Sequence, residues 1–93
     1  MFVRHLVFLL VGNSAMEWKE EVKIKFGEHL LSLLEEHGLK HDCKPSLRQL
    51  AIRSDLEYSN VQRISKGQVD LALTTIFSLA KGLDIKPMIL LDF

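Results

Sequence analysis

The segment SLRQLAIRSDLEYSNVQRISKG, residues 46–67, carries the strongest local signals in this chain of 93 residues. It opens with a capping box, in which the Ser46 hydroxyl can accept a hydrogen bond from the backbone N–H of Gln49. We therefore expect a helix to begin at Leu47. Its inward-facing side chains should be those of Leu47, Leu50 and Ala51. Ser54 and Asp55 interrupt this helix, and aspartate tolerates the left-handed conformation that a tight turn requires.

A second short helix is expected from about Tyr58 to Lys66, closed by Gly67, with Val61 and Ile64 pointing inward. Four polar residues spaced i, i+3, i+4 and i+7 form one stripe on its other side: Ser59, Gln62, Arg63 and Lys66. Such a stripe is often only a solvated helix face. Two short helices joined by a tight turn also make a helix-turn-helix, whose second helix fits the major groove of DNA. Arginine, glutamine and serine pair with base edges there.

Hydrophobic periodicity predicts the remaining helices. A helix over residues 18–37 would bury Trp18, Val22, Phe26, Leu30, Leu33 and Leu34. Gly38 stands where a glycine would end that helix, before a polar loop over residues 39–45. A fourth helix would bury Leu73, Ile76, Phe77, Leu79, Ala80 and Leu83. Asp70 is placed to cap it, and Pro87 suits the first turn of a short last helix. The sequence thus predicts an all-α domain of five helices over residues 16–93.

Residues 1–15 form an apolar extension that stands apart from this domain. Its apolar run from Leu6 to Gly12 is far shorter than the roughly 20 residues that a membrane-spanning helix needs. The composition suits a short N-terminal β-strand that pairs with a second copy as a dimer arm. The run also just reaches the length of a signal-peptide core, and a start assigned too early, with Met16 as the natural first residue, is a further reading. The residues leave these alternatives open.

Charge is balanced over the whole chain but segregated along it. Lysine plus arginine number 12 and aspartate plus glutamate number 12, so the net charge is zero, whereas DNA-binding domains are usually basic. Residues 16–37 carry three lysines against six glutamates, while residues 46–68 carry four cations against two acids. The basic part therefore coincides with the predicted helix-turn-helix. The single cysteine, Cys43, excludes an internal disulfide and fits a reducing cytoplasm.

From Ser46 to Asp92 the chain resembles the Cro/repressor family, the XRE-type, lambda-repressor-like helix-turn-helix proteins. The matching pieces are SLRQLAIRSDL for the first helix and turn, EYSNVQRISKGQ for the recognition helix, and LTTIFSLAKGLDI for the next helix. FGEHLLSLLEEHGL is similar to the family's first helix, so the resemblance covers about 70 of 93 residues. It implies a five-helix domain that binds double-stranded DNA, usually as a homodimer. The apolar run Met88-Ile89-Leu90-Leu91 would suit subunit pairing if it is exposed.

The resemblance also implies the roles of individual residues. Base edges would be read by Tyr58, Ser59, Gln62 and Arg63. Phosphates would be bound near Ser46, Arg48, Asn60, Lys66, Gly67 and Gln68, the last two through their backbone. Arg53 is expected either to add a phosphate contact or to be solvated.

The chain departs from the family pattern at Leu47, where glutamine is frequent, and at Asp55, which replaces the turn glycine. After Gly67 the link, which is often basic in the family, reads Val69-Asp70-Leu71. Fewer cations there predict weaker non-specific binding with a shallower salt dependence.

The functional expectation is a cytoplasmic, sequence-specific DNA-binding transcription regulator, acting as a repressor and without membrane association. One alternative is an antitoxin-type regulator that also binds a protein toxin. Another is a helix-turn-helix fold used only for protein–protein interaction, which an electronegative or occluded recognition helix would favour. His37, His41 and Cys43 are too few to specify a metal site, so we expect no metal and no cofactor. No nucleophile stands beside a base, so we do not expect an enzyme.

Overall fold

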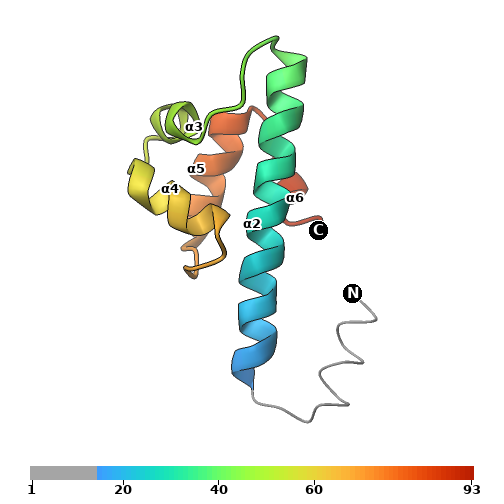
Figure 1. Ribbon diagram of the computed structural model, residues 1–93, viewed down its shortest axis with the longest axis vertical. Coiled ribbons are helices and arrows are strands. Elements are labelled where there is room, and N and C mark those ends of the chain that lie inside the picture. Colours follow the sequence, from blue (N-terminus) through green and yellow to red (C-terminus); the bar gives the residue numbers. More distant parts are fainter. Residues whose placement is uncertain (1–14) are drawn as a thin grey trace.

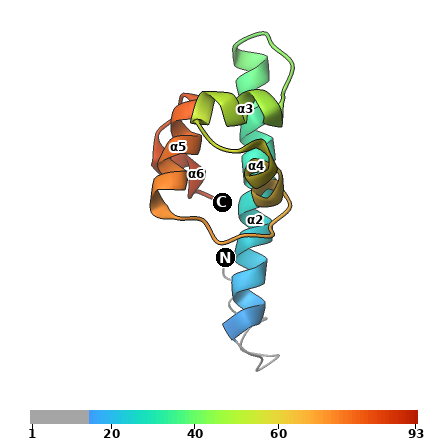
Figure 2. The ribbon, with the colours of Figure 1, turned by 90° about the vertical axis from the view of Figure 1, so that its left-hand side faces the viewer.

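The computed structural model describes residues 15–93, which form five α-helices and no strand. Their bounds are α2 (Ala15–Lys40), α3 (Leu47–Ser54), α4 (Tyr58–Ser65), α5 (Leu73–Leu83) and α6 (Pro87–Leu90). The four shorter helices pack beside one part of α2, and the N-terminal turns of α2 project beyond them (Figures 1 and 2). The prediction of an all-α, five-helix fold is confirmed. The predictions of a strand, a dimer arm or a late start concern residues 1–14, which lie outside the described residues.

A single hydrophobic core holds these helices together. Its most fully buried side chains are those of Leu30, Leu50, Val61, Ile64, Leu79, Leu83 and Leu90. Each such side chain contributes about 1.5–3 kcal/mol through burial. The last helix is fastened to α2 by the His29 ring, whose Nε2 lies 2.7 Å from the Ile89 carbonyl oxygen and donates to it. Phe26 and Phe93 also pack edge to face, with ring centroids 5.9 Å apart.

The helix α2 is longer than the periodicity predicted. It continues through Gly38 to Lys40, and the left-handed residue that follows is Asp42, with φ of 53°. Gly38 is therefore not the glycine that ends the helix. A Cβ atom at Gly38 would lie 2.7 Å from the Cys43 carbonyl oxygen, because the chain folds back along the helix there. Trp18, expected in the core, is 42% exposed, since it lies in the first turns of α2, away from the core.

Two predictions for α5 are wrong. The helix begins at Leu73 with Ala72 at the N-cap position and no side-chain cap, so Asp70 does not cap it. Leu73 and Phe77 are both more than half exposed, because the apolar stripe is wider than the face that the core covers. The prediction that Pro87 begins a short last helix is confirmed. Among residues 15–93, no helix is both long enough and apolar enough to cross a membrane.

The helices α3 and α5 approach each other closely at Gly82. A Cβ atom at Gly82 would collide with the Ser54 hydroxyl and would lie 3.0 Å from Leu50 Cδ1. Ser54 is 3% exposed, and its hydroxyl has no hydrogen-bond partner in the described chain. Arg53 Nε donates to the Gly82 carbonyl oxygen at 2.8 Å, which satisfies a carbonyl in the last turn of α5. Arg53 therefore has a structural bond that neither of its two predicted roles included.

Candidate nucleic-acid interface

The helices α3 and α4 are joined by a tight turn of three residues, 55–57. The N-terminal cap of α3 forms as predicted, with the Gln49 N–H donating to Ser46 Oγ at 3.1 Å. At the other end Asp55 adopts the left-handed conformation, with φ of 57° and ψ of 44°. The Leu56 N–H then donates to the Ala51 carbonyl oxygen at 2.9 Å. These bonds close α3 and direct the chain into α4, and they confirm the predicted turn at Asp55.

The helix α4 presents one face to the core and the other to solvent. Val61 and Ile64 are almost completely buried, whereas Ser59, Arg63 and Lys66 are exposed and Gln62 is half-buried. In Figure 2, α4 lies on the side of α2 that faces the viewer, and no other described element covers it. The polar stripe predicted from the sequence is therefore continuous and accessible.

The C-terminal end of α4 is closed by two backbone hydrogen bonds. The N–H of Gly67 donates to the Ile64 carbonyl oxygen and that of Gln68 to the Arg63 carbonyl oxygen, each at 3.0 Å. This is the Schellman arrangement, with Gly67 in the left-handed region at φ of 73°. Because both N–H groups already donate within the helix end, only the exposed Gln68 side chain remains available for the phosphate role expected of this backbone.

Two glycines set the distance between α4 and α2. A Cβ atom at Gly67 would lie 2.7 Å from the Ile24 Cα atom, and one at Gly27 would lie 2.5 Å from the Ser65 carbonyl oxygen. Gly27 would also meet the Ile64 carbonyl oxygen at 2.9 Å. Backbone therefore packs directly on backbone at both points. This contact fixes how α4 projects from the rest of the domain.

The N-terminal end of α4 is open to an anion. Glu57 occupies the N-cap position but makes no side-chain capping bond. The first N–H group of α4 that bonds within the described chain is that of Asn60, which donates to the Glu57 carbonyl oxygen at 3.1 Å. The preceding N–H groups and the helix dipole favour a negative group at this end.

Side chains of α3 and α4 meet beside this end. The Arg48 guanidinium lies over the Tyr58 ring, 4.2 Å from its centroid, and forms a cation–π contact between the first turns of the two helices. Along α4, Arg63 Nη2 donates to Asn60 Oδ1 at 3.4 Å, a long bond that a better acceptor can replace. The structure thus pairs Arg48 with Tyr58 between the two helices, and Arg63 with Asn60 along α4.

A histidine pair lies at the far end of α2, remote from α4 in Figure 1. The rings of His37 and His41 are in contact, with centroids 4.3 Å apart and planes tilted by 33°. Partial burial lowers the pKa of His37 below its usual value, and the charges of Arg53 and His41 lower it further. Within residues 15–93, no group of three or more histidine, cysteine or acidic side chains is placed to hold a metal ion.

Two short helices joined by a tight turn, with an exposed polar face on the second, define a helix-turn-helix protein. The chain is similar to the crystal structure of the restriction-modification controller protein C.AhdI from Aeromonas hydrophila, with 35% sequence identity and a TM-score of 0.67. The similarity covers 76% of this chain and 94% of that chain. The chain belongs to the Cro/repressor, XRE-type family of helix-turn-helix DNA-binding proteins. No protein-family model and no curated protein sequence matches it.

Proposed function

We propose that this protein is a transcription regulator that binds double-stranded DNA in a sequence-specific manner as a homodimer. The observation that carries the proposal is the accessible polar stripe on α4, opposite the buried Val61 and Ile64. A helix of this width fits the major groove, where base pairs present distinguishable patterns of donors and acceptors. The relative C.AhdI is a restriction-modification controller, which supports a regulatory role for this chain as well.

We assign base reading to the solvent-facing side of α4, through Tyr58, Ser59, Gln62 and Arg63. Arg63 is the strongest candidate, because arginine donates two parallel bonds to guanine and the 3.4 Å bond to Asn60 is easily exchanged. The Arg48 guanidinium packs on the face of the Tyr58 ring, and this contact limits how far the ring can move. Ser59 is exposed in the first turn of α4, the end of a recognition helix that contacts base edges.

We assign phosphate binding to the residues around the stripe: Ser46, Arg48, Asn60, Lys66 and the side chain of Gln68. The Ser46 oxygen accepts the Gln49 N–H, which leaves the hydroxyl proton free to donate to a phosphate. Lys66 is exposed at the C-cap of α4, and its charge would neutralise one phosphate. We assign Gly67 no bond to DNA; its part in the interface is to let the end of α4 pack closely against α2 and so to position α4.

Exposed apolar side chains on α5 and α6 support the homodimer. Leu73, Phe77, Met88 and Leu91 are each at least half exposed. Leu73 and Phe77 are four residues apart on one face of α5, and α5 packs against α6, which carries Met88 and ends at Leu91. Apolar groups gathered in this way usually mark an interface. Two copies joined there would present their recognition helices to half-sites about one helical turn of DNA, roughly 34 Å, apart.

The proposal includes a working domain over residues 16–93, a repressor role and a cytoplasmic location, without enzymatic activity or a cofactor. An antitoxin-type regulator that also binds a toxin remains compatible with the same fold. A role in protein–protein interaction alone is less well supported, because no other described element covers the outer face of α4, and this face carries the exposed cations Arg63 and Lys66. An occluded or acidic helix would have favoured that alternative.

Selection from a random duplex library at low salt, with the full chain and with Arg63→Ala, tests the proposal. We expect the wild type to enrich an inverted repeat, and the variant to lose or relax the preference at one position in each half-site. Lys25→Ala is the matched control, because Lys25 is an exposed cation of α2 outside the proposed interface. Salt-sensitive binding without enrichment of any sequence would refute sequence-specific recognition. Sedimentation of Phe77→Glu, expected to be monomeric, tests the dimer separately.

A further inference from the structure

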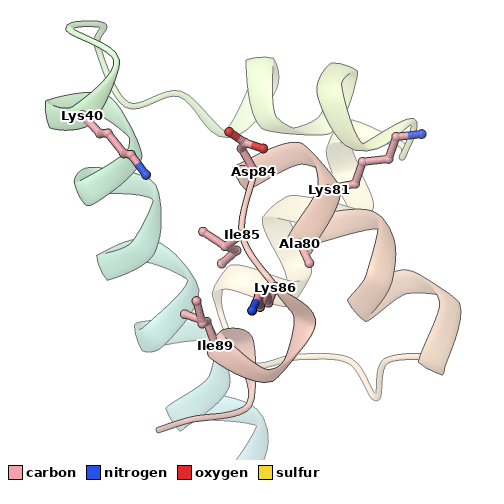
Figure 3. Close-up of a pocket in the computed structure, with 7 residues that line it drawn as sticks. All are labelled: Lys40, Ala80, Lys81, Asp84, Ile85, Lys86 and Ile89. Carbon is pink, nitrogen blue, oxygen red and sulfur yellow. The ribbon is translucent and has the colours of Figure 1, made fainter.

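A cleft of about 580 Å³ lies between the C-terminal end of α2, the end of α5 and α6 (Figure 3). Its apolar lining comes from Ala80, Ile85 and Ile89. In Figure 3 the side chains of Ile85 and Ile89 point into the space that faces α2. Ile89 is 39% exposed, so this lining remains partly in contact with water.

Charged residues around the cleft are mainly cationic. Lys40, Lys81 and Lys86 line it together with one acid, Asp84, and none of the four forms an ion pair within residues 15–93. Lys40 reaches from α2 towards the α5–α6 side, and Lys86 lies near Ile85 and Ile89, whereas Lys81 extends away from α2 (Figure 3). Lys40 and Lys86 are therefore the cations closest to the open space.

Helix electrostatics explain only some of these lysines. Lys40 and Lys81 lie in the last turns of α2 and α5, where a cation complements the helix dipole. Lys86 occupies the N-cap position of α6, where a positive charge gains nothing from the dipole. Its charge beside exposed apolar surface fits a partner that brings both carboxylates and apolar groups.

We propose that this cleft is a docking site for an acidic, amphipathic segment of a protein partner. Charge complementarity with Lys40 and Lys86 would orient the segment, and its apolar side chains would cover Ile85 and Ile89. In Figure 1, α6 lies on the opposite side of α2 from α4, so the cleft stays accessible while α4 occupies a DNA groove. The site is independent of DNA reading, and it would let a DNA-bound regulator recruit or receive a second protein.

The test uses a labelled synthetic helical peptide with glutamates on one face and leucines on the other, titrated with the full chain and followed by fluorescence anisotropy. The cleft variant is Lys40→Glu with Lys86→Glu, and a second variant is Ile89→Ser. The matched control is Lys19→Glu with Lys25→Glu, which changes the net charge equally at exposed positions elsewhere on α2. Thermal unfolding and DNA binding of every variant report whether the fold and the α4 interface are intact.

We expect saturable binding to the wild type and the control, and binding weaker by about tenfold or more in both cleft variants. A peptide with lysines in place of the glutamates should not bind. The proposal is overturned by equal binding of that lysine peptide, by an equal loss in the control, or by no binding to the wild type. Loss of self-association in the cleft variants would also overturn it, since the occupant would then be a second copy. DNA binding is measured on the same proteins. If it is intact while the peptide fails to bind as expected, the docking proposal fails and the proposed DNA-binding function stands.

Discussion

Substitution of Gly27 by alanine should separate α4 from α2 and weaken DNA binding. The new Cβ atom would lie 2.5 Å from the Ser65 carbonyl oxygen, about 0.9 Å inside the 3.4 Å at which ordinary contact begins. Because the obstacles are backbone carbonyls, no side-chain rotation relieves the clash, and α4 must move. A gap of 0.5–1 Å forfeits roughly a quarter to a half of the dispersion energy at the separated atoms.

The net cost follows from two opposing terms. Overpacking of a core costs about 1–3 kcal/mol, and a clash with backbone belongs near the upper end of that range. Alanine recovers about 1 kcal/mol relative to glycine in a helix interior. We therefore expect the free energy of unfolding to fall by about 1–2 kcal/mol, and Tm by roughly 4–16 °C for a domain of this size. Urea denaturation and calorimetry measure both quantities.

The effect on DNA should exceed the effect on the fold. At a temperature where Gly27→Ala remains folded, we expect affinity for the selected operator to fall by about tenfold, since displaced side chains lose aligned bonds to base edges. Affinity for non-specific DNA, and its dependence on salt concentration, should stay at the wild-type value, because no cation is removed. Gly82→Ala is the informative comparison, because its new Cβ atom would clash mainly with the Ser54 side chain. Adding Ser54→Ala to Gly82→Ala should relieve that clash. Wild-type stability and operator affinity in Gly27→Ala would refute the role of this backbone contact.

Three further predictions address stability, pH and salt. Ser54→Ala should raise the free energy of unfolding by about 0.5–1.5 kcal/mol in urea titrations, because it removes a buried hydroxyl without a partner; a loss of stability would reveal a bond or packing role for that oxygen. The lowered pKa of His37 means that the unfolded chain binds its proton more readily, so stability should be complete above the ordinary value of 6.5 and should decline as pH falls through 6.5 towards the lower folded-state pKa. His37→Gln should flatten this dependence in thermal unfolding between about pH 7.5 and 5, and an unchanged slope would assign it to other groups. Lys66→Ala should weaken binding to all duplexes alike and reduce the slope of log K against log salt by about one, whereas a change at one base position would make Lys66 a base reader.

The local signals in the sequence predicted the helix-turn-helix well, because each depends on a few neighbouring residues. The Ser46 cap, the turn at Asp55 and the end of α4 at Gly67 are all set by hydrogen bonds that backbone N–H groups donate to acceptors within six residues. The stripe on α4 followed from periodicity alone. Which of its residues contact bases or phosphates stays a prediction, since that depends on the bound DNA.

The errors concern residues whose roles depend on contacts between distant segments. Gly38 looked like a helix end by position, but α2 continues past it. A glycine is needed there because the chain that returns at Cys43 leaves no room for a side chain. Arg53 looked like a surface cation, yet it bonds a carbonyl 29 residues further along the chain. Gly27 carried a usable signal in the sequence, since a glycine inside a predicted helix often marks close packing.

Three aspartates, Asp42, Asp55 and Asp84, occupy left-handed positions where glycine would fit without strain. They also account for a quarter of the acidic residues that bring the net charge to zero. Replacement of all three by glycine would ease the turns and leave a net charge of plus three. Such a variant would hold any duplex longer and at higher salt, at the expense of discrimination between operator and bulk DNA. Under the proposed function, the residues that shape the turns would therefore also limit how long the protein stays on the wrong sequence.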